Sequence, residues 1–391
     1  MTVLLIVIYL VFISLGLPDS LFGVAWPVVH REFGLEESFA SLYGIIIGVC
    51  TGGVSNIAGP LLRKFGTARV TFVSTLLTII GLLAMSFAPN IVVMMIFAVI
   101  LGYGGGVIDT GLNNYVSLHY KAQHMNWLHC FWGVGVTISP MVMSLFLEGE
   151  GSGWRNGYRV VALLQSLIAF AVLVSLPKWK KTEKSQIAAV QPDEQQAKFS
   201  LKEIFTKKGV VTSILSVGFY CAMEFMLGTW GATYAVNVYN FTPDDAAKWV
   251  SLYYGGIMLG RMLAGFIAIK VDDDTLIKCG VVVSILGVVM LFLPIGNASL
   301  VGYLLIGTGF GPVFPCILHS IPSRFGGQFS ADITGYHMFA GYGIGFGIQL
   351  IYAFVATSTT FKITPFVLMA LCLILFATQL YTEKTIKKAK G

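Results

Sequence analysis

The stretch IVVMMIFAVILGYGGGVIDTGLNNYVS, residues 91–117, decides the fold class of this chain. It is long and apolar, and its single charged side chain is that of Asp109. About 20 consecutive apolar residues are enough for a helix to cross the hydrocarbon core of a bilayer. The segment therefore predicts a transmembrane helix whose second half is rich in glycine and carries an acid.

Composition extends this interpretation to the whole chain. Of 391 residues, 56% are hydrophobic and 11% are charged, and the mean hydropathy is +0.79. Because a soluble domain carries about 25% charged residues, a soluble enzyme, a disordered chain and a nucleic-acid-binding protein are excluded. The six cysteines lie in apolar runs and lack metal-ligand spacing. We therefore expect neither a bound metal nor a disulfide framework.

Twelve apolar runs of this kind occur along the chain. They lie near residues 3–30, 37–62, 68–87, 91–117, 125–147, 157–177, 210–238, 246–269, 275–293, 298–320, 332–356 and 362–381. The pattern predicts an all-α integral membrane protein with an N-terminal six-helix half (1–177), a polar linker (178–209) and a C-terminal six-helix half (210–391). Within the linker, Ser200 and Glu203 have capping-box spacing, which predicts the start of a short amphipathic helix on the membrane surface.

Basic residues predict the orientation. One set of loops holds most of them, namely Arg63, Lys64, Arg69, Lys121, Lys270, Lys278, Arg324 and the lysines of the linker and the C-terminal tail. Cytoplasmic loops carry the excess of Lys and Arg in membrane proteins, so we expect both termini in the cytoplasm. The compact chain is typical of a monomeric, multi-pass protein of a bacterial inner membrane.

Three acids lie well inside predicted spans: Asp19, Asp109 and Glu224. A carboxylate at mid-membrane costs about 2.5–3.5 kcal/mol on insertion scales, so such residues usually face a cavity or a partner. All three are candidate functional residues. The alternative for each is a carboxyl group that is neutral or hydrogen-bonded between helices and serves packing alone.

Asp109 has polar neighbours at helical spacing. Asn113 follows it by four residues and so shares its helical face, and Gly105 and Gly106 lie on that face one turn earlier. In the next span, Asn126, His129 and Trp132 also recur at helical spacing. A histidine near a carboxylate could relay a proton, and Trp132 could stack on a sugar ring; a hydrogen-bonded interior histidine and a packing tryptophan are the alternatives.

The C-terminal half contributes a second set of polar residues. Glu224 shares a helical face with Tyr220, and Tyr253 lies in the next span. Arg261, in the same span as Tyr253, is expected to form a structural ion pair or to extend toward the interface. Span eleven adds the candidate binding residues His337 and Gln349 in a glycine-rich region.

Span ten contains GTGFGPVFPCI, residues 307–317. Its glycines and prolines, Gly309, Gly311, Pro312 and Pro315, predict an irregular, bent helix that lines a cavity.

These segments resemble the major facilitator superfamily, and more closely its fucose–galactose–glucose cation symporter branch. The resemblance rests on GYGGGVIDTGLNN (102–114), YCAMEFMLGTWGATY (220–234), YYGGIMLGRMLAG (253–265) and GFGPVFP (309–315), within a layout of six plus six spans. It implies alternating access between two halves, and it implies that Asp109 is the acid that couples transport to a cation.

We therefore expect a secondary active transporter for a small neutral polar solute such as a sugar. Asp109, with Asp19, is expected to bind the coupling ion, H⁺ rather than Na⁺, and no other cofactor is expected. A neutral solute is inferred because no lysine or arginine is expected at mid-membrane beside the carboxylates. The alternative is a proton-driven exporter of cationic or amphipathic compounds, and a membrane enzyme or receptor finds no supporting motif.

Overall fold

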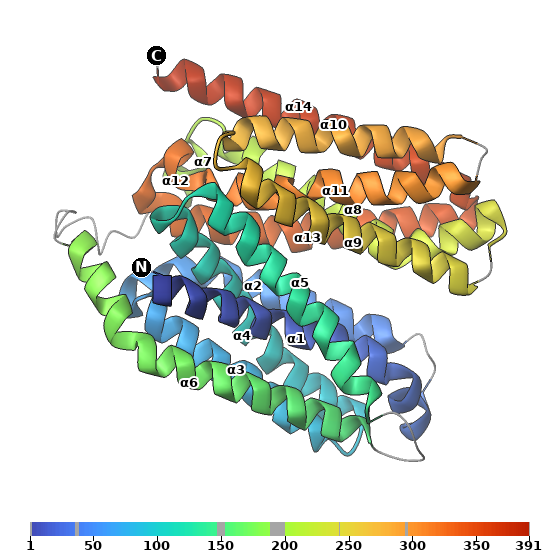
Figure 1. Cartoon of the computed structure of the whole chain (residues 1–391), viewed down its shortest axis with the longest axis horizontal. Helices are drawn as coiled ribbons and strands as arrows, with labels where there is room; N and C mark the ends of the chain where they lie inside the picture. The colour runs from blue at the N-terminus through green and yellow to red at the C-terminus, as the bar shows by residue number, and fades with distance from the viewer. Residues whose placement is uncertain are drawn as a thin grey trace. The chain divides into compact units, whose positions relative to one another are not determined.

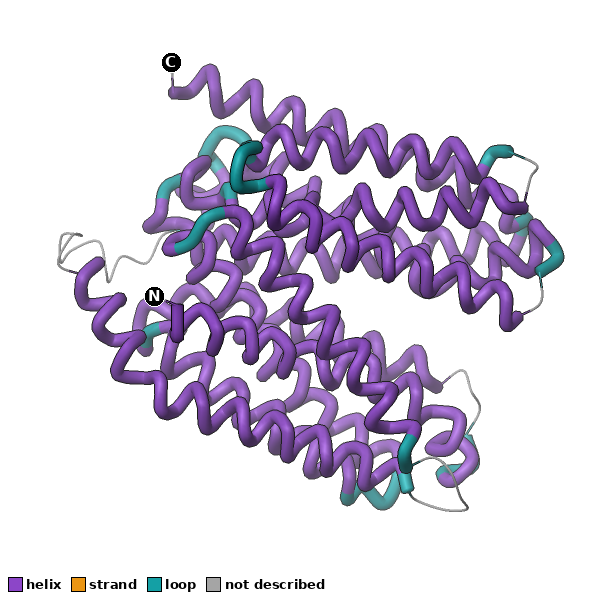
Figure 2. Tube along the Cα trace, in the orientation of Figure 1, coloured by secondary structure: helices purple, strands orange, loops and turns teal. Residues whose placement is uncertain are grey.

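A computed structural model describes residues 2–35, 39–146, 153–187, 200–241, 243–293 and 296–390. Helices form nearly all of this trace, and short loops join them (Figure 2). The first six long helices are α1 (Thr2–Glu32), α2 (Ala40–Phe65), α3 (Thr67–Ser86), α4 (Ile91–His119), α5 (Ala122–Ser144) and α6 (Trp154–Ile187). The second six are α8 (Val210–Tyr239), α9 (Pro243–Ile267), α10 (Asp273–Leu291), α11 (Gly296–His319), α13 (Ser330–Ser358) and α14 (Thr364–Lys390).

Twelve long helices thus occupy the predicted spans in the described part of the chain. Eleven of them are long and apolar enough to cross a membrane. The remaining one is α5, which carries the polar side chains of Gln123, His124, Asn126 and His129 in its first two turns. The predicted fold class, an all-α membrane protein with twelve spans, is confirmed.

Short helices fill the connections: α7 (Leu201–Phe205), α12 (Ile321–Phe325) and two 3₁₀ turns, η3 (Gly327–Phe329) and η4 (Phe361–Ile363). The start of α7 is where the capping-box spacing predicts it, because Ser200 Oγ accepts a hydrogen bond from the Glu203 backbone N–H at 3.1 Å. Helix α6 extends ten residues beyond the predicted end at 177, to Ile187. Residues 188–199 of the predicted linker lie outside the described residues.

The helices group into two compact units. One comprises Met1–Tyr115 with Leu128–Lys198, and the other comprises Val116–Trp127 with Phe199–Gly391. Within each unit the long helices lie side by side (Figure 1). The connection between α4 and α5 therefore belongs with the second unit, although the sequence pattern assigns it to the first half.

Glycines set the distance between α1 and α5. A Cβ atom at Gly16 would lie 2.3 Å from the Trp132 carbonyl oxygen, and one at Gly135 would lie 2.2 Å from the Ile13 carbonyl oxygen. Neither backbone could approach the other with larger residues at these positions. This crossing brings the residues one turn away, Asp19 on α1 and Trp132 on α5, into register.

Helix α4 is held in the same manner. A Cβ atom at Gly106 would lie 2.5 Å from the Thr51 carbonyl oxygen of α2, and one at Gly104 would lie 2.8 Å from the Ser74 carbonyl oxygen of α3. The glycines before Asp109 therefore serve mainly to pack α4 between two neighbours. Gly105 is the more open one, with Leu15 as the nearest neighbour of an added Cβ, at 3.6 Å.

Span ten forms one continuous helix, and the bend predicted for it stays a prediction. Helix α11 continues through both of its prolines, Pro312 and Pro315. Its glycines have a packing role: a Cβ atom at Gly309 would lie 2.4 Å from the Gly280 carbonyl oxygen of α10, and one at Gly311 would lie 2.6 Å from the Arg261 backbone nitrogen of α9. The glycines thus let α11 fit closely between α9 and α10.

The α1–α5 crossing gives a test of this packing. Gly16→Ala should lower the thermal midpoint of the detergent-solubilised protein, because overpacking against a backbone carbonyl typically costs about 1–3 kcal/mol. Gly23→Ala, on the same helix with nothing within 4 Å of its added Cβ, is the matched control. Tryptophan fluorescence on heating would report both midpoints. Equal midpoints for the two variants would contradict the close crossing.

Candidate functional site

A hydrogen-bonded chain of three side chains lies inside the first unit. The Asn113 amide donates from Nδ2 to the Asp109 carboxylate Oδ1 at 2.7 Å, and also to the Asp109 carbonyl at 2.9 Å. His129 Nε2 lies 2.9 Å from Asn113 Oδ1. The sequence placed Asp109 and Asn113 on one helical face and offered His129 as a histidine that could lie near the carboxylate; the structure joins α4 to α5 through these three residues.

The donors in this chain can be assigned from chemistry. An amide oxygen only accepts hydrogen bonds, so His129 Nε2 carries the proton and donates it to Asn113 Oδ1. That contact fixes the amide with its NH₂ group toward Asp109. Asn113 and His129 are both buried, and the ring of Phe12 packs edge-on against His129 at a centroid distance of 5.4 Å. The Asn113 amide is thus held between the imidazole of His129 and the carboxylate of Asp109.

A second acid in the first unit has its own partner. The Trp132 indole N–H donates to Asp19 Oδ2 at 2.8 Å. One residue further along α1, Ser20 Oγ donates to the Val136 carbonyl at 2.8 Å. Both contacts follow from the close crossing of α1 and α5. Trp132 therefore has a polar role toward Asp19 in addition to the aromatic surface that the sequence suggested.

Asn126 does not join the chain around Asp109. It belongs to the second unit, where its Nδ2 donates to the Ala122 carbonyl at 3.1 Å and contacts Cys316 Sγ at 3.6 Å. The helical spacing of Asn126 and His129 is real, but α5 passes from one unit to the other between these two residues.

Glu224, the acid well inside a span of the second unit, lies beside a buried cation. Arg261 Nη2 lies 3.8 Å from Glu224 Oε1, and Arg261 is 4% exposed. The expectation that Arg261 forms an ion pair agrees with this geometry. The expectation that no guanidinium lies beside the carboxylates is wrong, and the pair as a whole is neutral.

Aromatic side chains surround this ion pair. Tyr220 is fully buried one turn before Glu224 on α8, where its ring stacks on Phe314 with centroids 5.5 Å apart. Tyr253, also fully buried, lies beside the ring of Tyr254 at 5.2 Å on α9. A carboxylate, a guanidinium and two phenols therefore occupy one region of the second unit.

The two remaining candidates lie on α13. His337 is fully buried, with Nδ1 2.7 Å from the Ile333 carbonyl and Nε2 2.9 Å from Ser213 Oγ. Because a carbonyl only accepts, Nδ1 donates and Nε2 accepts from the hydroxyl, so both nitrogens are used within the protein. Gln349 Nε2 donates to Thr229 Oγ1 at 2.7 Å, and this pair is more open.

Sequence analysis missed a buried amide and a charged network. Gln165 is fully buried on α6, accepts from Thr78 Oγ1 at 3.0 Å and donates to the Ser14 carbonyl at 2.7 Å.

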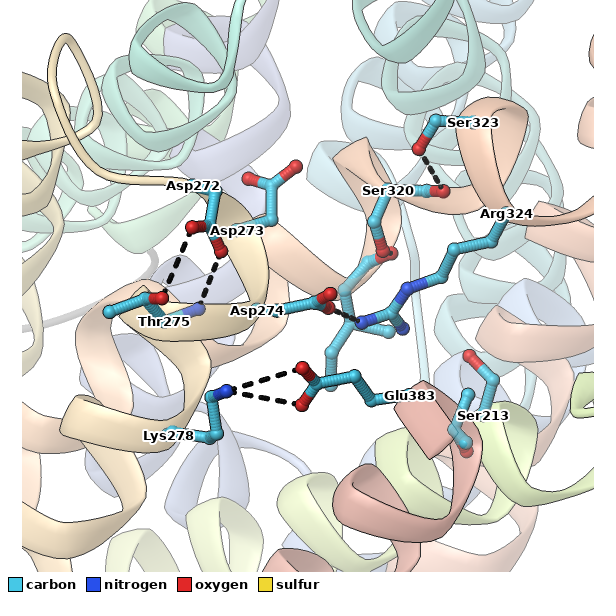
Figure 3. A network of polar contacts seen from close by, with 12 residues as sticks. Ser213, Asp272, Asp273, Asp274, Thr275, Lys278, Ser320, Ser323, Arg324 and Glu383 are labelled. Carbon is cyan, nitrogen blue, oxygen red and sulfur yellow. Dashed lines mark hydrogen bonds and ion pairs between the residues drawn. The ribbon is translucent and has the colours of Figure 1, made fainter. Parts of the chain in front are cut away.

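The charged network lies at the end of the second unit where α10 begins (Figure 3). There Arg324 pairs with Asp274, and Lys278 pairs with Glu383 at 3.1 Å. The run of three aspartates at 272–274 was the available signal.

One histidine of this network has acceptors on both sides. His319 Nδ1 lies 2.7 Å from Asp273 Oδ2, and Nε2 lies 2.9 Å from the Tyr120 carbonyl. A ring that donates from both nitrogens is an imidazolium.

Outside the span, the pKa of Asp272 is lowered because the Thr275 backbone N–H donates to its carboxylate at 2.9 Å. Among the described residues, no group of His, Cys, Asp and Glu could hold a metal ion.

Comparison with known proteins identifies the family. Residues 8–350 match the sequence model of the Major Facilitator Superfamily. The glucose/mannose transporter GlcP of Bacillus subtilis is 22% identical over 319 residues, which are 79% of this chain and 77% of that protein. The class H tetracycline resistance protein of Pasteurella multocida is 24% identical over 302 residues, covering 73% of this chain and 72% of that protein.

Solved structures share the fold. The E. coli fucose:proton symporter FucP superposes with a TM-score of 0.75 at 13% sequence identity, over 97% of this chain and 98% of that one. One family model matches most of the chain. The described structure has twelve long helices, with two polar clusters inside apolar segments. These observations lead to one conclusion. This protein is a member of the Major Facilitator Superfamily, a multi-pass membrane transporter and not an enzyme.

Proposed function

We propose that this transporter is a proton-coupled symporter of a small neutral sugar that works by alternating access between its two six-helix halves. The observation that carries the proposal is the chain from Asp109 through Asn113 to His129, which joins a titratable group to a fixed amide in an apolar helix. A sugar needs donors and acceptors for its hydroxyls, and this chain offers both.

Proton binding at Asp109 would remove a charge that is costly to carry through an apolar interior. Protonation would also weaken the 2.7 Å hydrogen bond that Asn113 donates to the carboxylate, because the charge-assisted form is the stronger one. Asn113 would then be available to a substrate hydroxyl. Asp19, held by Trp132, is proposed as a second group that binds the coupling proton.

The substrate class is supported by the protein's relatives and by its polar groups. GlcP transports glucose and mannose by its name, and FucP is a fucose:proton symporter. In the second unit, the neutral Glu224–Arg261 pair offers both an acceptor and donors without a net charge. Neutral hydroxyl-rich solutes match such a pair better than ions do, because they leave no unpaired charge in the apolar region.

Export of cationic compounds is the second candidate, and the tetracycline resistance relative favours it. Proteoliposomes with an imposed proton gradient distinguish the two. Labelled D-glucose, D-mannose and L-fucose should be tested for gradient-driven accumulation, and ethidium for proton-driven transport in the opposite direction. We expect accumulation of at least one sugar and no movement of ethidium; ethidium transport without sugar transport would replace the symport proposal.

Asp109→Asn should abolish accumulation of the transported sugar against its gradient while leaving sugar binding and equilibrium exchange largely intact. Asparagine keeps the size of the side chain and an oxygen that can accept from Asn113, but it cannot gain and lose a proton. Uptake into proteoliposomes with and without a proton gradient measures both properties. Glu203→Gln, which changes an exposed carboxylate of α7 in the same way, is the control. Concentrative uptake by Asp109→Asn at the wild-type level would remove Asp109 from the coupling step.

Glu224→Ala should weaken sugar binding about ten- to a hundredfold at pH 5.5 and pH 7.5 alike, because unpaired sugar hydroxyls cost about 1–3 kcal/mol. A second proton site at Glu224 would instead change the pH dependence and leave the affinity at low pH unaltered. Binding isotherms at the two pH values separate these roles.

The Glu224→Ala variant also leaves Arg261 buried without its partner, which typically destabilises a protein by about 3–5 kcal/mol. The double variant Glu224→Leu/Arg261→Met removes both charges and should restore the thermal midpoint without restoring binding. If this double variant binds sugar like the wild type, Glu224 is not part of the recognition site.

A further inference from the structure

A cavity of about 260 Å³ opens at the end of the second unit where α8 begins and α14 ends. It is lined by Lys207, Lys208, Arg324, Phe325, Ile386 and Ala389. Its three charged side chains are all cations, and none of the described residues that line it is an acid. The cavity lies away from the Glu224–Arg261 pair near the middle of the helices, and the transport proposal does not use it.

Arg324 divides its guanidinium between two neighbours. Its Nη2 pairs with Asp274, as Figure 3 shows, whereas Nη1 is buried and has no hydrogen-bond partner in the described part of the chain. The side chain is only 7% exposed. A buried guanidinium N–H without an acceptor is costly. An acceptor from a ligand in the cavity would satisfy it.

The two lysines contribute positive charge without an ion-paired acid among the described residues. Lys207 is held in place, with Nζ 3.6 Å from the centroid of the Phe329 ring. Lys208 is exposed at the rim. Among the residues that the structure describes, neither lysine forms an ion pair with an acid. A cavity that gathers these cations attracts an anion.

The start of α8 adds to this field. Gly209 is its N-cap, has a φ of +87° and supplies no side-chain cap. A Cβ atom on Gly209 would lie 3.3 Å from Ile386 of the cavity wall. The N-terminus of a helix carries a partial positive charge and unpaired backbone N–H groups. The helix therefore begins next to the cavity with its positive end.

The neighbouring acids do not cancel this charge. They line a separate cavity of about 290 Å³ that shares Arg324 and Ile386 with the first. Within it, Asp273 pairs with His319 at 2.7 Å, and Glu383 pairs with Lys278 at 3.1 Å and Lys387 at 2.7 Å. Asp274 pairs with Arg324, which lines both cavities. Asp273, Asp274 and Glu383 thus each have a cationic partner, whereas Lys207 and Lys208 have no ion-paired acid in the described part of the chain.

We propose that the first cavity is a binding site for a phosphate group. Guanidinium and ammonium groups are the usual partners of phosphate oxygens. Apolar side chains, those of Phe325, Ile386 and Ala389, form the other half of the lining, which suits the headgroup and glycerol region of an anionic phospholipid. Basic pockets between transmembrane helices on the cytoplasmic side are sites where such headgroups bind. A free phosphate ion shares the same recognition chemistry.

Thermal unfolding of the detergent-solubilised full chain tests the site. Three probes are titrated separately: dihexanoyl phosphatidylglycerol, dihexanoyl phosphatidylcholine and inorganic phosphate. Phosphatidylglycerol should raise the thermal midpoint of the wild type, and phosphatidylcholine should not, because its choline brings a further cation to a cationic cavity. Lys207→Ala/Lys208→Ala should need roughly 30-fold more phosphatidylglycerol for the same shift, since each lysine near an anionic headgroup contributes about a factor of five.

Two further variants make the result specific. Lys202→Ala removes an exposed lysine of α7 outside the cavity and should behave like the wild type. Lys207→Arg/Lys208→Arg keeps the charge and should retain the shift. A shift with phosphatidylglycerol alone identifies a lipid headgroup as the occupant, and a shift with inorganic phosphate as well identifies the phosphate group itself. No shift in the wild type, or an equal shift in the double alanine variant, would overturn the site, and neither result bears on sugar transport.

Discussion

The cost of an unpaired polar group in an apolar surrounding governs where the candidate functional side chains of this protein lie. Each acid inside a span has a specific partner: Asp109 has Asn113, Asp19 has Trp132, and Glu224 has Arg261. In water such pairs would contribute little. In helices this apolar the alternative is an unsatisfied charge. The Asp19–Trp132 and Glu224–Arg261 pairs, which join different helices, therefore favour particular helix faces lying together. The polar clusters are therefore both the proposed machinery and a constraint on packing.

Close helix approach makes these pairs possible. The crossing of α1 and α5 at Gly16 and Gly135 brings Asp19 to Trp132, and the contact of α4 with α2 at Gly106 positions the turn that carries Asp109. Glycine serves here because a side chain would separate backbones that touch. In the proposed alternating-access cycle, this close packing would let each half move as one body while the pairs of Asp19 and Asp109 stay intact.

Charge is distributed differently at the end of the second unit. There Asp273, Asp274 and Glu383 pair with His319, Arg324, Lys278 and Lys387, whereas Lys207 and Lys208 line a separate cavity. The proposed phosphate site follows from this separation of paired and unpaired charge. It would link the stability of the unit to the lipid around it by simple mass action, because a ligand that binds only the folded state stabilises that state.

The sequence alone could predict twelve helices, a membrane protein and the three acids inside its spans. These predictions depend on local properties, namely hydropathy over about 20 residues and the rarity of charged side chains within such a segment. The pairing of Asp109 with Asn113 could also be predicted, since four-residue spacing places both on one helical face. The contact of His129 with Asn113 required the packing of α5 against α4. The partners of Asp19 and Glu224 were decided by tertiary structure alone. Helices that are apolar on all sides carry no periodicity that indicates which face meets which neighbour. Only the packed structure therefore shows that Trp132 meets Asp19 and that α11 continues through its prolines.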